Sequence, residues 1–151
     1  MIIAIKNVLV AFLLFAFFGS EAWGDVSIHA GGYSRHFFIN NATNESHDFA
    51  AIQLDSYVVG RYNNSFGRET YFLAYEWNKP LLKNVEGFVW VGLTRGYTHC
   101  WKPYDENDGT SNVCPMFSTG VRYTKWSIQP SLMLVGDALS IEARYVFRRI
   151  K

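Results

Sequence analysis

The sequence predicts an all-β fold: an eight-stranded antiparallel transmembrane β-barrel that follows a cleaved signal peptide. Three observations lead to this prediction. Apolar and polar residues alternate in many short segments, the number of these segments is even, and longer and shorter connections alternate between them. No segment repeats its apolar residues with the period of a helix.

The first 24 residues have the pattern of an export signal. A weakly basic start containing Lys6 precedes a continuous apolar run over 8–18, and small residues precede position 25. The run is shorter than the roughly 20 residues that a membrane-spanning helix needs. We therefore expect residues 1–24 to be removed and residues 25–151 to form one barrel domain; the alternative is an uncleaved N-terminal anchor.

The remaining chain divides into eight segments of alternating pattern, separated by Gly, Asn and Asp residues. The predicted strands are 26–38, 48–54, 57–63, 69–78, 87–99, 115–123, 126–135 and 138–147. Polar loops are expected at 40–47, 64–68 and 100–114, tight turns at 55–56, 124–125 and 136–137, and a somewhat longer connection at 79–86. Eight is the smallest strand number of bacterial membrane barrels, whose outer loops are long and whose periplasmic turns are short.

The alternation also predicts which side chains face out. In the last segment, apolar residues at 139, 141, 143, 145 and 147 alternate with Ser140, Glu142 and Arg144, which would line the lumen. Further lipid-facing positions are Tyr71, Leu73, Tyr75, Trp77, Val89, Val91, Leu93, Trp126, Ile128, Leu132 and Leu134. A lumen of eight strands is either filled by side chains or holds one slim ligand. Pro130 removes one ladder donor and marks either a bulge or a lateral gap.

Composition and cysteine usage narrow the function classes. The net charge is +1 and no block of Lys and Arg is present, so we expect no nucleic-acid partner. Aromatic residues make up 17% of the chain, which suits membrane-interface girdles. Cys100 and Cys114 flank a polar loop, and an even cysteine count in an exported chain favours a disulfide over a metal site, so we expect no bound metal. Closing this loop would contribute about 3 kcal/mol.

Two polar segments are expected to meet at the outer end of the barrel. His36 lies near the end of the first strand, and Asn64-Ser65 opens the second outer loop. A serine within reach of a histidine is the minimum for an activated hydroxyl nucleophile. His29, on the same strand, is a rival, but we expect it closer to the periplasmic side.

These residues resemble the motifs of the lipid A palmitoyltransferase family of Gram-negative outer membranes, in a divergent PagP-like form. The similar positions are His36 on the first strand, Asn44-Glu45 in the first outer loop, Asn64-Ser65 in the second, and the strand ending Ala74-Tyr75-Glu76-Trp77. The chain departs from the family at Asn64, where an Asp is expected.

The resemblance implies transfer of a fatty acyl chain from a phospholipid to lipid A, by a monomer in the outer membrane, without a cofactor. His36 would be the general base, Ser65 the nucleophilic or assisting hydroxyl, and Asn64 an orienting or oxyanion donor. Arg35 and Arg68 would bind lipid phosphates. The length of the bound acyl chain would be set by the part of the lumen formed by Phe72, Phe88, Trp90 and Gly92.

Two other hypotheses about the function stay open. One is a non-enzymatic outer-membrane barrel that binds a partner through its disulfide-pinned loop, and the other is a secreted barrel that binds a small ligand. The sequence also leaves open the acyl-chain length, the acceptor position, and whether the gene belongs to a bacterium or to a phage that infects one.

Overall fold

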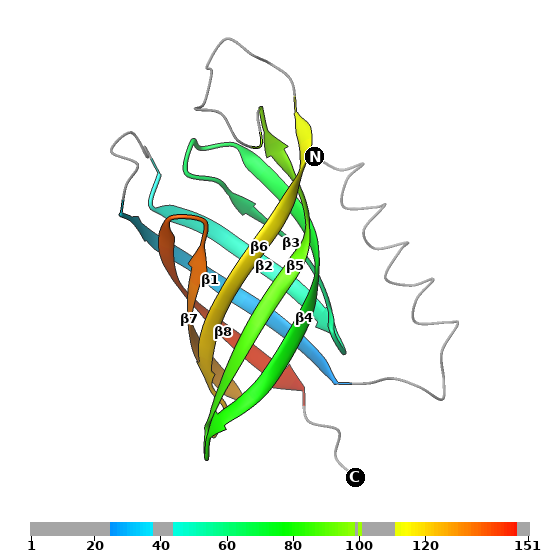
Figure 1. Ribbon diagram of the computed structural model, residues 1–151, viewed down its shortest axis with the longest axis vertical. Helices are drawn as coiled ribbons and strands as arrows, with labels where there is room; N and C mark the ends of the chain where they lie inside the picture. The colour runs from blue at the N-terminus through cyan, green and yellow to red at the C-terminus, as the bar shows by residue number, and fades with distance from the viewer. Residues whose placement is uncertain (1–24, 38–43, 99, 101–110, 148–151) are drawn as a thin grey trace, which may run out of the picture.

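The computed structural model describes residues 25–37, 44–98, 100 and 111–147. These residues form a closed barrel in which each strand pairs antiparallel with the next and the last pairs with the first (Figure 1). The strands are β1 (Val26–His36), β2 (Ser46–Leu54), β3 (Tyr57–Asn63), β4 (Glu69–Leu82), β5 (Val85–Tyr97), β6 (Asn112–Tyr123), β7 (Ile128–Val135) and β8 (Ala138–Phe147). The all-β, eight-stranded antiparallel barrel is thus confirmed; the predicted signal peptide, 1–24, lies outside the described residues.

The clearest error of strand prediction concerns the connection between β4 and β5. A longer connection over 79–86 is wrong, because β4 continues to Leu82 and β5 begins at Val85. Pro80 remains opposite Glu86, and the register then shifts before Leu82. The shift accommodates a residue without an amide hydrogen, so the proline does not end the strand.

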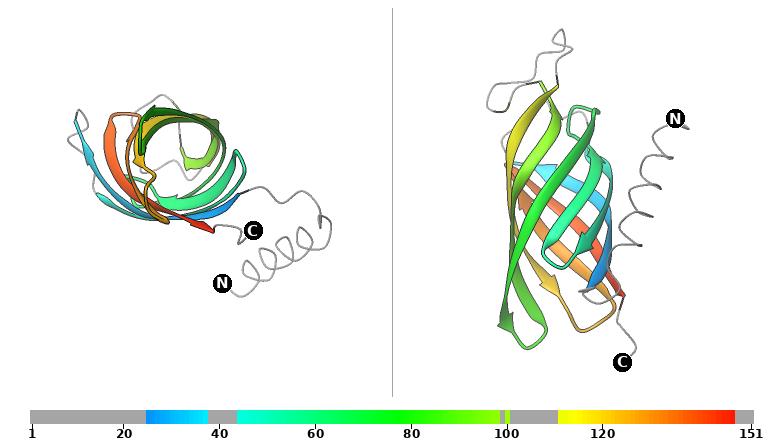
Figure 2. Two further views of the ribbon diagram at one scale, coloured as in Figure 1. Left: turned by 90° about the horizontal axis from the view of Figure 1, so that it is seen from below. Right: turned by 90° about the vertical axis from the view of Figure 1, so that its right-hand side faces the viewer.

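The predicted outward faces are confirmed as outward. Leu73, Trp77, Leu93 and Ile128 each expose more than half of their surface, and the other predicted outward positions are exposed or half-buried. The view along the barrel in Figure 2 shows the strands as one ring, so these side chains form a belt on its outer surface. Within the described part of the chain, no helix has the length and apolar character required to cross a bilayer.

One half of the lumen is filled by paired charges. Arg122 lies 2.9 Å from a carboxylate oxygen of Glu76 and 2.8 Å from one of Glu86. Arg144 also approaches Glu76, at 3.3 Å, and the indole N–H of Trp90 donates to Glu76 at 2.6 Å. Charged side chains that are buried away from water need such partners, because burying an unpaired ion costs several kcal/mol of folding free energy. This cluster closes the lumen toward the end where the β2–β3, β4–β5 and β6–β7 turns lie, here called the turn rim.

The other half of the lumen is aromatic and leads to the opposite end, here called the loop rim. Phe49 and Phe72 stack with ring centroids 5.7 Å apart, and Trp90 stacks on Phe72 at 5.9 Å. The predicted disulfide between Cys100 and Cys114 is confirmed and links Cys100 to β6 at this rim.

Candidate active site

A bulge in β1 decides which side chains of this strand enter the lumen. On the turn-rim side of the bulge the odd-numbered residues Ser27 and His29 are buried, whereas on the loop-rim side the even-numbered residues Gly32 and Ser34 are buried. Both ladders of β1 shift register between Gly31 and Tyr33, and Gly31 and Gly32 have φ of +133° and +104°. Glycine adopts such angles without the steric cost of a Cβ. The Gly-Gly pair therefore turns His36 inward; strict alternation would have turned it out.

The loop between β3 and β4 is built around the side chain of Asn64. Its carbonyl oxygen accepts from the backbone N–H groups of Phe66 and Arg68, and its amide donates to the hydroxyl of Thr70 and the carbonyl of Gly96. The loop is also tied to the first loop, since the N–H of Asn44 donates to the Ser65 carbonyl. These bonds hold Ser65 in a fixed place at the loop rim.

The tight turn between β7 and β8 brings Asp137 to the end of β1. Gly136 adopts φ of +59°, which the turn requires. The carbonyl of Asp137 accepts from the N–H of Phe37, and His36 pairs with Ala138 in the β1–β8 ladder. Barrel closure thus places a turn near the C-terminus beside a strand end near the N-terminus.

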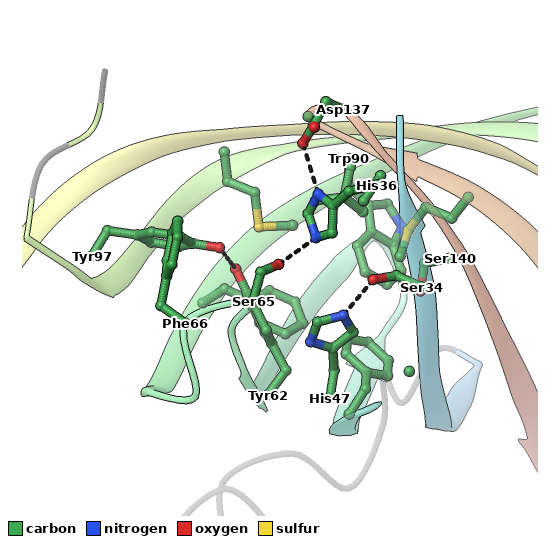
Figure 3. A pocket seen from close by; sticks show the side chains of 18 of the residues that line it. Ser34, His36, His47, Tyr62, Ser65, Phe66, Trp90, Tyr97, Asp137 and Ser140 are labelled. Atoms are coloured by element: carbon green, nitrogen blue, oxygen red, sulfur yellow. Dashed lines mark hydrogen bonds and ion pairs between the residues drawn. The ribbon is translucent and has the colours of Figure 1, made fainter. Parts of the chain in front are cut away.

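His36 lies between a hydroxyl and a carboxylate. Its Nε2 is 2.6 Å from Oγ of Ser65, and its Nδ1 is 2.9 Å from Oδ1 of Asp137 (Figure 3). Since a carboxylate only accepts, Nδ1 carries the hydrogen, and in the neutral ring Nε2 accepts the hydrogen of Ser65. The side chain of His36 is 9% exposed and that of Asp137 is 23% exposed. This is the hydrogen-bond order of a Ser–His–Asp triad.

The triad lines a cavity of about 320 Å³ in the loop-rim half of the lumen. This volume is near the lower end of the roughly 300–1,000 Å³ of ligand pockets. Apolar walls come from several strands, namely Phe49, Phe72, Trp90, Met116, Met133 and Val135. A cavity of this size and lining fits one slim apolar chain, with its polar end at the triad.

The structure brings together two of the three predicted catalytic residues. His36 and Ser65 are hydrogen-bonded, as described above. Asn64 is adjacent in sequence, but both of its amide hydrogens are engaged in the loop, so none is left for an oxyanion. Asn64 therefore positions Ser65 and does not line the cavity. Position 64 has no carboxylate, and Asp137 supplies one to His36 instead.

Of the predicted chain-binding residues, Phe72 and Trp90 line the cavity. Phe88 lies on the far side of Trp90, where its ring contacts the Arg122 guanidinium at 4.3 Å. Gly92 is not part of the cavity wall; a Cβ there would lie 2.0 Å from the Leu73 carbonyl oxygen, so the glycine allows β4 and β5 to approach. Phe88 and Gly92 support the barrel beneath and beside the cavity.

The two arginines expected to bind phosphate lie outside the cavity wall. Arg35 is exposed on the outward face of β1, because the bulge that turns His36 inward turns its neighbour out. Arg68 is half-buried in the β3–β4 loop. The rival histidine, His29, is buried in the charged half of the lumen, with its ring nitrogens 3.0 Å from Glu142 and 2.9 Å from Gln53.

Sequence reasoning missed Asp137, and also Ser34 and His47, which line the same cavity. The sequence predicts only a tight turn at Asp137, although its place next to the end of β1 follows from closing the barrel. Among the described residues, no group of three or more His, Cys, Asp or Glu side chains is arranged to hold a metal ion.

The fold and this site define a closed eight-stranded barrel with a Ser–His–Asp arrangement at one rim. No protein-family model matches the chain, and no curated protein is similar enough in sequence to match it. The similarity to the lipid A palmitoyltransferase family therefore stays a prediction from the residues quoted above.

Proposed function

We propose that this protein is a serine-dependent acyltransferase of the bacterial outer membrane, which moves a fatty acyl chain from a phospholipid to lipid A. The observation that carries the proposal is the position of His36 between Ser65 and Asp137 at an apolar cavity. A triad activates a hydroxyl for attack on a carbonyl carbon, and an adjacent apolar slot suits the acyl part of an ester.

The proposed reaction has two balanced steps. Ser65 Oγ attacks the ester carbonyl carbon while its proton moves to His36 Nε2, and Asp137 holds the Nδ1 hydrogen of the ring. The ester C–O bond breaks, the alcohol leaves with the proton from His36, and the acyl group stays on Ser65. A hydroxyl of the acceptor then gives its proton to His36 and takes the acyl group, which restores Ser65.

Two features support a place in the outer membrane. The outward belt of apolar and aromatic side chains has the character of a lipid-facing surface, whereas the inward residues in the half of the lumen near the turn rim are charged. With the loop rim outside, Ser65 would lie at the depth of the outer leaflet. Lipid A, the acceptor in the proposed transfer, is expected in that leaflet.

The short ladder between β6 and β7 supports sideways access of an acyl chain. The ladder between β6 and β7 begins at Ser118 opposite Val135, so the first half of β6 has no partner in β7. Met116 from this unpaired half lines the cavity. Pro130 lies just beyond the other end of the same ladder, next to Ser131. A chain could enter between β6 and β7 without leaving the bilayer.

Hydrolysis is the second candidate, with water as the acceptor. A Ser–His–Asp arrangement is sufficient for it, and the 23% exposure of the Asp137 side chain places solvent close to the triad. The partner-binding alternative depends on the loop over 101–113, most of which lies outside the described residues.

Mass spectrometry of lipid A and phospholipids from cells that express the protein tests these candidates. Transfer predicts lipid A with one added acyl chain together with lysophospholipid, and both products should vanish in Ser65→Ala. Ser56→Ala, in the β2–β3 turn at the opposite rim, should behave as the wild type. Free fatty acid without acylated lipid A would support hydrolysis, and unchanged lipids with folded protein would refute both enzymatic proposals.

A further inference from the structure

The cavity contains a second serine–histidine pair that the proposed reaction does not use. Ser34 on β1 and His47 on β2 are joined by a hydrogen bond of 2.5 Å between Oγ and Nε2. Nδ1 of His47 lies 2.6 Å from the backbone carbonyl of Asn63. Both side chains line the same cavity as Ser65 (Figure 3).

The direction of these hydrogen bonds follows from chemistry alone. A backbone carbonyl can only accept, so Nδ1 of His47 must carry the hydrogen. In the neutral ring Nε2 is then the acceptor, and the hydroxyl of Ser34 must donate to it. The Asn63 carbonyl thus accepts a hydrogen bond from Nδ1 of His47, as the Asp137 carboxylate does from Nδ1 of His36. The Ser34 oxygen is polarised in the sense that a nucleophile requires.

The pair is shielded from bulk water. Ser34 is 2% exposed, and His47 is also buried. The Gly31-Gly32 bulge turns Ser34 inward, as it does His36. A reagent can therefore reach Ser34 only by entering the cavity, which selects molecules with a slim apolar part.

Ser140 provides an internal comparison. It faces Ser34 across the β1–β8 ladder and lines the same cavity, but its hydroxyl donates to the carbonyl of Tyr33 at 3.3 Å. A carbonyl cannot take up the serine proton during attack, whereas an imidazole nitrogen can. The cavity thus presents three serines in three settings: one with histidine and carboxylate, one with histidine and carbonyl, and one with a carbonyl alone.

We propose that Ser34 and His47 form a second nucleophilic centre that reacts with acyl esters and with related electrophiles. Ser34 Oγ bonds to the ester carbonyl carbon, its proton passes to His47 Nε2, and the alcohol leaves with that proton. This goes beyond the proposed function, which uses Ser65 alone.

A fluorophosphonate with a short alkyl chain tests the proposal without knowledge of the substrate. Serine oxygen bonds to phosphorus, fluoride leaves, and the serine proton is released through the histidine. In detergent-folded Ser65→Ala protein, peptide mass spectrometry should find the label on Ser34. The rate should be lower than that at Ser65 in the wild type, on the order of 10²- to 10⁴-fold, because no carboxylate supports His47.

Two variants define the role of the pair. Adding Ser34→Ala to Ser65→Ala should abolish labelling in the cavity, and adding His47→Gln should lower the rate at Ser34 by at least about tenfold, as expected for loss of a general base. Ser140 should stay unlabelled throughout. A β-rich circular dichroism spectrum verifies folding, and His47→Gln keeps the test available if Ser34→Ala does not fold.

The outcomes separate this proposal from the previous one. Label on Ser34 but not on Ser65 in the wild type would support the second centre and refute the proposed function. Label on Ser65 alone in the wild type, together with no label on Ser34 after prolonged exposure of the Ser65→Ala protein, would refute the second centre. Equal labelling of Ser34 and Ser140 would also refute it, because reactivity would then not depend on His47.

Discussion

Replacing Asp137 with Asn tests whether the carboxylate orients His36. The turn itself should survive, because the bond between the β7–β8 turn and β1 uses the backbone carbonyl of Asp137 and the N–H of Phe37. The asparagine either presents its oxygen to Nδ1 without the charge, or presents its amide and drives the hydrogen to Nε2. In the second case His36 can no longer accept the proton of Ser65.

The magnitude follows from the exposure of the pair. In a buried triad the same change lowers the rate by about 10⁴, or about 5 kcal/mol at 1.36 kcal/mol for each factor of ten. The Asp137 side chain is 23% exposed, so water weakens its interaction with His36 and can partly replace it. We therefore expect a loss of about 10²- to 10³-fold, or about 3–4 kcal/mol.

The measurement is the second-order rate at which a fluorophosphonate labels Ser65, followed by peptide mass so that labelling of Ser34 is counted separately. Asp55→Asn is the matched control, since Asp55 lies in the β2–β3 turn at the opposite rim and its φ of +53° is one that asparagine tolerates. Asp55→Asn should retain the wild-type rate. If Asp137→Asn labels within threefold of the wild type, Asp137 does not support the serine–histidine pair.

Three further changes test the lumen, the cavity and the outer surface. Arg122→Met leaves Glu76 without its closest guanidinium and should lower the free energy of unfolding by about 3–5 kcal/mol, measured as a lower urea midpoint in lipid vesicles. A loss below about 1 kcal/mol would show that the cluster does not depend on this pair. Met133→Trp should fill the cavity and lower the labelling rate of a long-chain fluorophosphonate more than tenfold, while a short-chain reagent keeps its rate. Leu132→Trp, on the outward face, should change neither rate. An equal loss for both reagents in Met133→Trp would contradict a chain-binding cavity. Leu73→Arg on the outward belt should cost about 2–4 kcal/mol in vesicles, against about 0–1 kcal/mol for Leu82→Arg at the end of β4; equal costs would argue against a lipid-facing belt.

The strands were predictable from the sequence because the side-chain alternation is local. Strands β3 and β8 have the predicted bounds, and the outward belt follows directly from the period of two. The ends of β4 and β5 were not predictable in this way, since Pro80 usually indicates a strand end and a register shift accommodates it here.

The site was predictable only in part, because its geometry depends on contacts between distant segments. His36 and Ser65 are 29 residues apart, and His36 and Asp137 are 101 apart. The orientation of His36 depends on a bulge that strict alternation does not contain. The role of Asn64 also escaped prediction, because the four hydrogen bonds of its side chain form only once the loop has folded.

Trp90 connects the charged half of the lumen to the aromatic half that contains the cavity. One face of its indole lies against Phe72 and forms part of the cavity wall, while its N–H donates to Glu76. Glu76 is held in turn by Arg122. An apolar chain cannot advance past this point, because it would separate paired charges and leave them without partners. The ion cluster thus limits the depth of the cavity, and in the proposed reaction the acyl chain would stay near the loop rim, within reach of Ser65.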